Sequence, residues 1–208
     1  SPEFDKGAGV PISAIIFGGR RASTTPLVYQ SRDWNHGVFV GSIMASETTA
    51  AATGAVGVLR HDPMAMKPFC GYNMGDYFQH WIDMGKKLGD KAPKIFNVNW
   101  FRVDEDGHFI WPGFGDNLRV VEWIIKRVEG AVDADETAIG YVPKAEDINL
   151  EGLKDFSIDD LKTILEVDKA KWAKEADEIE NYYDTTFGDH MPKELRDSLA
   201  TLKANCAE

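Results

Sequence analysis

Aromatic side chains are concentrated between residues 96 and 114, where their spacing suits the binding of a flat ring. The six of them are Phe96, Trp100, Phe101, Phe109, Trp111 and Phe114. They alternate with polar and turn-forming residues, so the segment is not a uniformly apolar run. Asp106 and Gly107 have the chemistry of a tight turn, because glycine adopts positive φ without Cβ strain. We therefore predict a hairpin whose arms are residues 94–102 and 108–111.

A loop follows the hairpin at residues 111–115 and is too rich in proline and glycine to be a regular strand. Phe101 and Phe114 flank the hairpin tip and could sandwich a ring, and stacking is worth about 1–3 kcal/mol per base. Asn117 follows the loop and offers an amide that can pair with a base edge. A hydrophobic core hairpin and a platform for stacking sugars are the alternatives, and core packing is the default for an aromatic cluster.

A second candidate site, for phosphate, is Gly18-Gly19-Arg20-Arg21. It follows a short apolar run at residues 14–17 that has the pattern of a buried strand. Glycines let a ligand approach the backbone closely, and arginine can donate two hydrogen bonds to one phosphate. The alternative is a glycine turn that carries two solvated arginines. The chain contains no GxxxxGK[ST] motif, so this segment is not a P-loop.

Residues 46–58 are small, include two glycines and carry almost no charge. Such a segment buries little area and can exchange between ordered and disordered states, which predicts a mobile lid. An ordinary surface loop or helix end is the alternative. The lid residues that we single out are Ser46, Glu47, Thr48, Thr49, Ala50, Ala51, Ala52, Gly54 and Gly57.

The five histidines show no pattern of a metal site. None is paired with another histidine or an acidic residue at helical spacing, so HExxH-like chemistry is absent and we assign no metal ligand to this chain. His61-Asp62-Pro63 could orient a catalytic imidazole, although a hydrogen-bonded structural histidine is the commoner case. No serine nucleophile elbow and no Cys/His signature is visible.

Regular elements must position these groups. Residues 26–40 are ambiguous between strand and helix. Asn73 can cap one helix, and Asp116 or Asn117 can cap another. The inner faces that we predict for these two helices are Met74, Tyr77, Phe78, Trp81 and Ile82 in the first, and Leu118, Val121, Ile124, Ile125 and Val128 in the second.

The chain reads as helices from about Leu150 onward. Ser157 and Asp160 have the spacing of a capping box, and Pro192 suits the start of a helix. Residues 167–186 carry the alternating charges of a solvated helix face. We expect this half to be a peripheral helical appendage.

Composition and charge limit the classes of function. Hydrophobic residues make up 43% of the chain and charged residues 27%, which is ordinary for a soluble globular protein. No run of about 18 apolar residues occurs, so we expect no membrane span. The net charge of −11 comes from residues 91–208, which hold 15 basic and 26 acidic residues. This balance argues against a nucleic-acid partner but is compatible with one small anion held by arginines.

The cysteines and the start of the chain point to the cytoplasm. Cys70 and Cys206 are far apart and neither belongs to a CxxC pair, so we expect free thiols in a reducing compartment. Residues 1–4 resemble a cloning remnant, and no signal peptide is visible.

Seven motifs together resemble the GTP-dependent phosphoenolpyruvate carboxykinases. They run in that family's order and spacing from about Gly9 to the C-terminus, which is far more specific than any one motif; the C-terminal helical part resembles the family more loosely. Ala45 departs from the pattern, because some relatives carry an arginine there, just before the lid. The motifs are FGGRR (17–21), WNHG (34–37), SETTAAA (46–52), HDP (61–63), FCGYN (69–73), NWF (99–101) and WPGFGDN (111–117).

The resemblance implies an enzyme of gluconeogenesis or anaplerosis that converts oxaloacetate and GTP to phosphoenolpyruvate, GDP and CO₂. It implies that Arg20 contacts the nucleotide phosphates and that residues 46–58 form a lid over the active site. Lid closure would shield the enolate intermediate from water, which otherwise protonates it to pyruvate. The guanine pocket implied by the resemblance consists of Trp100, Phe101, Phe109 and Phe114, with Asn117 at the base edge.

The resemblance also implies an α/β fold. Residues 9–145 would be the mixed-sheet portion of the family's C-terminal nucleotide-binding lobe, residues 146–208 a C-terminal helical segment, and residues 1–8 a linker. The family's phosphate-binding loop, its ligands for Mn²⁺ or Mg²⁺ and its oxaloacetate-binding arginine lie upstream. We therefore expect the C-terminal third of the enzyme, inactive without the N-terminal part. A non-catalytic nucleotide- or sugar-binding module and a structural domain with only core aromatics remain as other classes.

Overall fold

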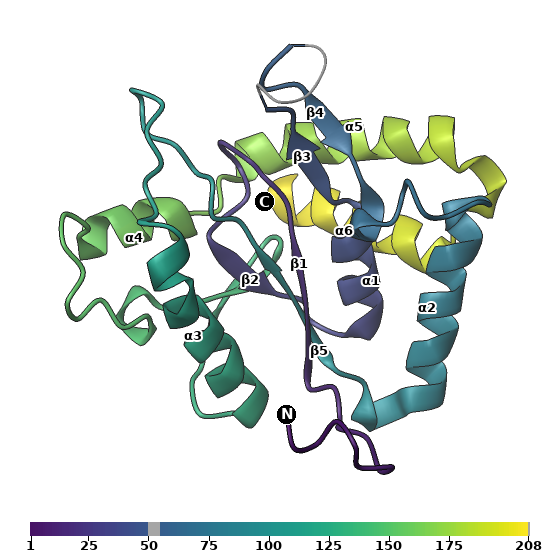
Figure 1. The fold of residues 1–208 in the computed structure, drawn as a ribbon. Coiled ribbons are helices and arrows are strands. Elements are labelled where there is room, and N and C mark those ends of the chain that lie inside the picture. Colours follow the sequence, from purple (N-terminus) through teal and green to yellow (C-terminus); the bar gives the residue numbers. More distant parts are fainter. Residues whose placement is uncertain (50–54, 208) are drawn as a thin grey trace.

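A five-stranded mixed sheet forms the centre of the chain in the computed structural model, which describes residues 1–49 and 55–207 (Figure 1). The strand order is β1-β5-β2-β7-β6. β1 pairs with β5 in parallel, and the other neighbours pair in antiparallel fashion. A separate hairpin of β3 and β4 projects from one end of the sheet. The strands are β1 (Ala14–Gly18), β2 (Val28–Gln30), β3 (Ala45–Glu47), β4 (Leu59–His61), β5 (Lys94–Val98), β6 (Asp135–Thr137) and β7 (Gly140–Val142).

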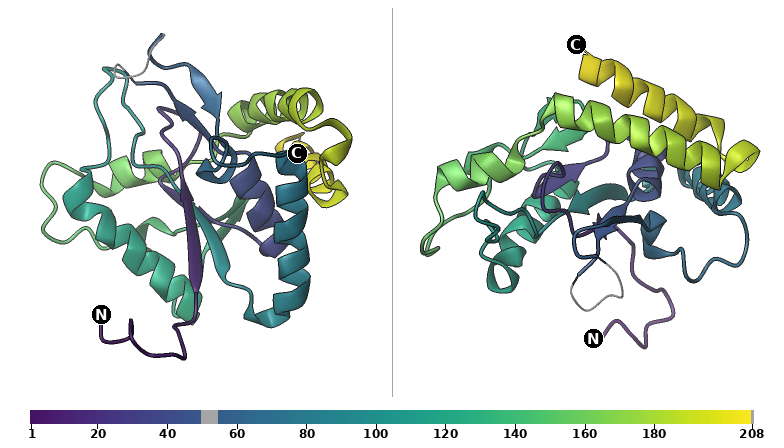
Figure 2. Two further views of the ribbon diagram at one scale, coloured as in Figure 1. Left: turned by 45° about the vertical axis from the view of Figure 1, so that its right-hand side comes forward. Right: turned by 90° about the horizontal axis from the view of Figure 1, so that it is seen from above.

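Helices lie on both sides of the sheet, as the turned views show (Figure 2). Ile95 and Phe96 are neighbours on β5 and point to opposite faces, because side chains alternate along a strand. Ile95 packs into a core with α1, α2, α5 and α6, and Phe96 packs into a second core with α3 and α4. This arrangement confirms the predicted α/β fold with a mixed sheet. The helices are α1 (Trp34–Ser42), α2 (Met74–Leu88), α3 (Asn117–Glu129), α4 (Ile158–Leu165), α5 (Lys169–Thr186) and α6 (Lys193–Ala207).

The apolar run at residues 14–17 forms β1 as predicted, but as an edge strand instead of a fully buried one. Phe17 is buried, whereas Ile16 keeps 44% of its surface exposed. Ile16 is in register with Phe96, so it lies on the same face of the sheet as α3. The ambiguous residues 26–40 contain both predicted element types, first β2 and then most of α1.

The start of α2 agrees with the sequence. The Asn73 side chain accepts a hydrogen bond from the backbone N–H of Gly75 at 2.8 Å, which confirms the predicted cap. Met74, Phe78 and Ile82 on the predicted inner face are buried.

The inner face of α3 differs from the prediction. Of the predicted face, Ile124 is buried, but Leu118 and Ile125 are 75% and 52% exposed, and the other buried side chains are Val120 and Trp123. The helix carries two apolar stripes, and apolar spacing alone does not say which one faces the sheet. The stripe that contains the large indole of Trp123 is the buried one, because packing it against Phe96 removes the most apolar surface from water.

The expectation of a peripheral C-terminal appendage is wrong. Trp172, Ile179 and Tyr183 of α5 and Leu195 of α6 belong to the same core as Phe39 of α1. The charges predicted for a solvated face do lie on the outer side of α5, but the opposite side is apolar and buried. The predicted capping box at the start of α4 and the helix after Pro192 are both present.

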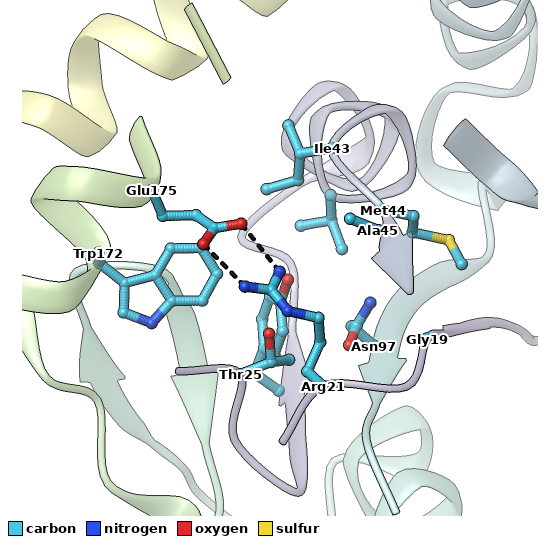
Figure 3. Close-up of a pocket in the computed structure, with 11 residues that line it drawn as sticks. Gly19, Arg21, Thr25, Ile43, Met44, Ala45, Asn97, Trp172 and Glu175 are labelled. Atoms are coloured by element: carbon cyan, nitrogen blue, oxygen red, sulfur yellow. Dashed lines mark hydrogen bonds and ion pairs between the residues drawn. The ribbon is translucent and has the colours of Figure 1, made fainter. Parts of the chain in front are cut away.

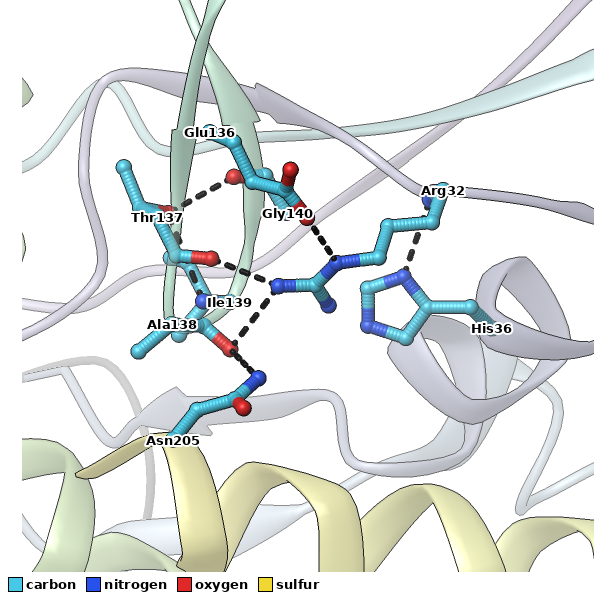
Figure 4. Close-up of polar contacts among 8 residues, drawn as sticks. All are labelled: Arg32, His36, Glu136, Thr137, Ala138, Ile139, Gly140 and Asn205. Carbon is cyan, nitrogen blue, oxygen red and sulfur yellow. Dashed lines mark hydrogen bonds and ion pairs between the residues drawn. The ribbon is translucent and has the colours of Figure 1, made fainter. Parts of the chain in front are cut away.

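Arg32 ties the segment before α1 to the β6–β7 hairpin (Figure 4). Its Nε donates to the Glu136 carboxylate at 3.0 Å, and its Nη2 donates to the carbonyl oxygens of Thr137 and Ala138. Asn205, near the end of α6, donates to the same Ala138 carbonyl at 3.4 Å. The last helix and the edge hairpin are therefore held together by polar contacts as well as by the core.

His36 makes the stability of this region depend on pH. Its ring Nδ1 accepts the backbone N–H of Arg32 at 2.9 Å, which requires an unprotonated nitrogen. Burial, helped by the charge of Arg32, lowers the pKa of His36 from 6.5 to about 4. The folded state therefore binds this proton less tightly than the unfolded state, so the contribution is fully present above pH 6.5 and is lost as the pH falls towards 4. The loss approaches about 3 kcal/mol.

His36→Asn tests this dependence, because asparagine offers an oxygen acceptor near the position of Nδ1 and does not titrate. We expect the free energy of unfolding in urea to fall between neutral and acidic pH by more for the unaltered chain than for the variant. Parallel pH profiles for the two proteins would contradict the assignment to His36.

Candidate functional site

The Gly-Gly-Arg-Arg segment leaves β1 as a turn that is hydrogen-bonded on both sides. On one side, the Arg20 N–H donates to Ser46 Oγ at 3.0 Å, and the Arg20 carbonyl accepts the N–H of Glu47 at 2.8 Å. On the other side, the Ala22 carbonyl accepts the N–H of Val103 at 3.1 Å. The turn therefore lies between the base of the β3–β4 hairpin and the aromatic segment.

Gly19 is required by the fold itself. An added Cβ would lie 2.6 Å from the carbonyl oxygen of Ala45 in β3, closer than real Cβ contacts. The close approach of the turn to β3 thus explains this glycine without a ligand. Approach of a phosphate to the same backbone stays a prediction.

Arg20 and the aromatic segment meet in one pocket of about 260 Å³. The Arg20 Cζ lies 4.7 Å from the centroid of the Phe101 ring, within the range of a cation–π contact. Arg20, which is predicted to bind phosphate, therefore lies against Phe101, which is predicted to stack on a base. The lining of the pocket includes Gly18, Arg20, Ser46, Trp100 and Phe101.

Arg21 is buried and pairs with Glu175 of α5 (Figure 3). Its two terminal nitrogens each donate to one carboxylate oxygen of Glu175 at 2.8 Å, and the two side chains are only 10% and 9% exposed. Burial by itself would lower the pKa of Arg21, but the hydrogen bonds and charge of Glu175 outweigh it and raise the pKa. Of the two arginines, Arg20 is the one that lines the pocket beside Phe101.

The aromatic segment is an irregular hairpin without two regular arms. Within residues 99–117, strand-like pairing is limited to one isolated bridge, between Val103 and Phe109. The predicted turn is present: the Asp104 N–H donates to the His108 carbonyl at 2.9 Å, and Gly107 has φ of 82°. The turn is thus confirmed, but the arms predicted at residues 94–102 and 108–111 are shorter than expected.

Five of the six aromatic side chains of this segment divide into two groups, and the sixth, Trp100, is half-buried against the core while it lines the pocket. Phe96 and Trp111 are buried in the core on the α3 side of the sheet, so the core alternative holds for these two. Phe101 and Phe109 meet edge to face with ring centroids 5.8 Å apart. Phe114 is 96% exposed, as a residue presented by a loop should be. The outward-facing aromatics remain available to a ligand.

Asn117, the first residue of α3, is oriented by Trp111. The Trp111 Nε1–H donates to Asn117 Oδ1 at 2.9 Å. Because an indole nitrogen can only donate, this contact identifies Oδ1 and leaves both amide hydrogens for other partners. The cap position belongs to Asp116, whose carboxylate accepts from the Arg119 Nε–H at 2.9 Å but from no backbone N–H of the helix.

The predicted lid begins as the β3–β4 hairpin. The Thr48 N–H donates to the Val58 carbonyl at 2.9 Å, and Thr48 Oγ1 donates to the Ala55 carbonyl at 2.6 Å. The Glu47 carboxylate accepts the N–H of Ala22 at 2.8 Å, so the base of the hairpin is joined to the Gly-Arg turn. Ser46, Glu47, Thr48, Thr49 and Gly57 are described, whereas Ala50, Ala51, Ala52 and Gly54 lie outside the described residues.

His61 at the end of β4 packs as a structural residue. Its ring stacks on Tyr182 of α5 with centroids 3.9 Å apart and an interplanar angle of 9°. Burial lowers the pKa of His61 and raises that of Tyr182 to about 12. Both rings are therefore neutral near pH 7. His61 Nδ1 has no hydrogen-bond partner among the described residues, so the ring packs as a structural residue through stacking and not through the expected hydrogen bond.

Residues 1–49 and 55–207 show neither a candidate metal cluster nor a membrane-spanning helix. No group of three or more His, Cys, Asp and Glu side chains comes together there as a metal ion would require. In the same part of the chain, no helix has both the length and the apolarity to cross a bilayer.

Two residues of the site were not predicted from the sequence. Glu175 is one of many charges in α5, yet it lies three residues after Trp172 and four before Ile179, on the buried face of the helix. A carboxylate at that spacing is a usable signal, because buried charges are almost always paired. Asn99 belongs to the NWF motif, but nothing in its sequence context indicates a hydrogen-bonding role.

Comparisons with known proteins agree with each other. Residues 1–205 match the family described as the phosphoenolpyruvate carboxykinase C-terminal P-loop domain. The phosphoenolpyruvate carboxykinase (GTP) of Corynebacterium jeikeium is 55% identical over 204 residues, which are 98% of this chain and 33% of that protein. The protein of the same name from Renibacterium salmoninarum is 57% identical over 205 residues, again 98% and 33%. The protein of the same name from Treponema pallidum is 55% identical over 199 residues, which are 94% of this chain and 32% of that protein. The chain spans about a third of the length of these curated relatives.

Proposed function

The chain belongs to the phosphoenolpyruvate carboxykinase C-terminal P-loop domain family, and from this premise we propose that it is the guanine-nucleotide-binding part of a GTP-dependent carboxykinase. In the complete enzyme, the bond between C3 of oxaloacetate and its carboxylate breaks, releasing CO₂ and leaving the enolate of pyruvate. The enolate oxygen then takes the γ-phosphoryl group of GTP, which yields phosphoenolpyruvate and GDP. The observation that carries the proposal is the pocket that joins Arg20 to Trp100 and Phe101.

Arg20 and Phe101 account for the two ends of the nucleotide. The guanidinium of Arg20 supplies a fixed positive charge for the phosphates, and positioning and charge neutralisation are what phosphoryl transfer needs from a protein. Phe101, with Phe109 edge-on beside it and Phe114 presented from the next loop, supplies aromatic surface for the base. These contacts support a nucleotide held with its base at the hairpin and its phosphates towards the turn after β1.

Asn117 provides a reason for choosing guanine. Its Oδ1 already accepts the Trp111 indole N–H, so the free groups of the amide are donors. Guanine presents the acceptor O6 where adenine presents an amino donor. The Asn117 N–H groups can therefore donate to O6 of guanine, whereas in adenine they would face another donor, the amino group.

Residues 46–58 are proposed to cover the reacting groups. Ser46 lines the pocket and accepts the N–H of Arg20, so a rearrangement of the β3–β4 hairpin would act directly on the nucleotide site. Excluding water would keep the enolate from being protonated before it takes the phosphoryl group.

The remaining two-thirds of the enzyme is the partner that we propose for the open side of the sheet. β1 has one edge without a neighbouring strand among the described residues, and a free edge can pair with another strand. Ile16 on β1 and the exposed stripe of Leu118 and Ile125 on α3 add apolar surface that a partner would bury.

The divalent metal is also assigned to the remainder of the enzyme. The described residues hold no cluster of three or more His, Cys, Asp and Glu side chains that fits a metal centre. We expect the Mn²⁺ or Mg²⁺ ligands and the oxaloacetate-binding groups to come from the upstream part.

Nucleotide titration of the 208-residue chain tests the proposal. Because Trp100 lines the pocket, its fluorescence should change on addition of GTP at lower concentrations than of ATP, and glycans should have no effect. The change should be lost in Trp100→Phe. The same preparation should form no phosphoenolpyruvate in a coupled assay.

Each alternative has its own signature in this experiment. A response to glycans would indicate a sugar-binding module, and a flat response to every compound would indicate that the aromatics serve only the structure. If this chain alone formed phosphoenolpyruvate from oxaloacetate and GTP, the assignment of metal and oxaloacetate binding to the upstream part would be wrong.

A further inference from the structure

The Asn99 side chain links the turn that carries Arg20, the proposed phosphate end of the site, to the segment that carries Phe101, the proposed base end. Every donor and acceptor position of its amide is occupied. Asn99 directly follows β5 and is 1% exposed. Its Oδ1 accepts two backbone N–H groups, from Arg21 and from Phe101, each at 3.2 Å. Its Nδ2 donates to two carbonyl oxygens, those of Arg21 and Thr25, each at 2.9 Å. An asparagine side chain can make four such bonds, and all four are made here.

We infer that Asn99 is a positioning residue that fixes the distance and orientation between Arg20 and Phe101, and thereby the register of a guanine nucleotide across the site. One amide holds the backbone on the C-terminal side of Arg20 and the backbone N–H of Phe101 at the same time. The inference rests on the proposed function, because a register matters only to a ligand that spans both ends. Asn99 itself does not line the pocket and is not assigned a contact with the nucleotide.

The ladder between β1 and β5 ends at the pair Gly18 and Val98, and beyond it the turn is joined to the aromatic segment by few other contacts. One is the hydrogen bond from the Val103 N–H to the Ala22 carbonyl, which lies two residues after Arg20 on one segment and two residues after Phe101 on the other. The contact between the Arg20 guanidinium and the Phe101 ring is the second link, and a ligand that binds either group would compete with it. Thr24, three residues after the turn, has φ of 66°, which is uncommon for a β-branched residue, and the carbonyl of the next residue, Thr25, is one of the two that Asn99 Nδ2 holds.

Asn97 is a natural control for Asn99. It lies two residues earlier on β5 and is also buried, at 6% exposed. Its Oδ1 has no hydrogen-bond partner among the described residues. Replacing either asparagine removes a buried amide of equal size, but only Asn99 joins the two ends of the site.

Comparing ligands that occupy one end of the site with a ligand that occupies both ends tests whether Asn99 positions the two ends relative to each other. A ligand that engages two subsites gains affinity from simultaneous contact, and it loses that gain when the subsites are out of register. In the complete enzyme, calorimetry would give the affinities of GTP, guanosine and inorganic triphosphate for the unaltered protein, Asn99→Ala and Asn97→Ala. Urea unfolding of the same proteins reports any general loss of stability.

We expect Asn99→Ala to weaken GTP binding by roughly tenfold or more, since the affinity gained from simultaneous contact at both ends is lost when the ends fall out of register. The loss for GTP should exceed the combined losses for guanosine and triphosphate, and Asn97→Ala should show no such excess. Asn99→Ser introduces no charge and keeps a hydroxyl that can make part of these bonds, so it should show a smaller excess and remains informative if Asn99→Ala does not fold.

Two results would overturn the inference. One is an equal loss for GTP, guanosine and triphosphate in both Asn99 variants, which is the behaviour of a purely structural residue. The other is the same excess in Asn97→Ala. Failure of the unaltered complete enzyme to prefer GTP over ATP is a different result, which refutes the proposed function itself.

Discussion

Replacing Glu175 by alanine is expected to lower the free energy of unfolding by about 3–5 kcal/mol, because it leaves a buried charge without a partner. Arg21 is held in the core by two hydrogen bonds to this carboxylate, and both side chains are almost fully buried. The measurement is urea unfolding of the chain at neutral pH. Because the backbone of Arg21 belongs to the turn that carries Arg20, nucleotide binding should weaken as well.

A double variant separates the loss of the pair from the loss of its packing. Arg21→Met combined with Glu175→Leu removes both charges and keeps apolar volume, so it should be much less destabilised than Glu175→Ala. Asp184→Ala breaks the exposed Arg196–Asp184 pair and should cost at most about 1 kcal/mol. Equal costs for Glu175→Ala and Asp184→Ala would show that burial of the first pair has no energetic consequence.

Phe101→Ala in the complete enzyme is expected to weaken guanine nucleotide binding by about 1–3 kcal/mol while leaving divalent metal binding nearly unchanged. The ring is the proposed stacking surface for the base, and it also carries the guanidinium of Arg20 on one face. Phe114→Ala should act in the same direction, because this exposed ring is the proposed second side of the sandwich.

Phe69→Ala is a suitable control, since Phe69 is exposed and does not line the pocket beside Arg20. Calorimetric titrations with GTP and with Mn²⁺ give the two affinities for each variant. Equal losses of nucleotide and metal affinity in Phe101→Ala would argue against the sandwich and for a general disturbance of the site.

Local features were predictable from the sequence because they depend on neighbours a few residues apart. The Asn73 cap, the Ser157 capping box and the glycine turn at Gly107 are satisfied by bonds within a few residues of each group. The exposed aromatic at Phe114 follows from the Pro and Gly content of its loop. Family membership, too, was readable from the order and spacing of the motifs, and the comparison over residues 1–205 confirms it.

Choices between equivalent patterns were not predictable. The two apolar stripes of α3 are alike in sequence, and only packing against Phe96 selects the one with Trp123. The charges of α5 are likewise alike until Arg21, 154 positions earlier in the chain, selects Glu175. β1 was likewise predicted to be a buried strand, because a sequence does not state how many neighbouring strands a strand has.

The sequence by itself determined the family, the candidate residues of the nucleotide site and the local turns and caps, since each of these depends on residue type and short spacing. The tertiary structure alone decided that Arg20 faces the pocket while Arg21 is paired in the core, and that Asn99 joins the turn to the aromatic segment. These are contacts between residues 78 and 154 positions apart. They form because burial of polar groups is tolerated only where the folded chain brings a partner to them.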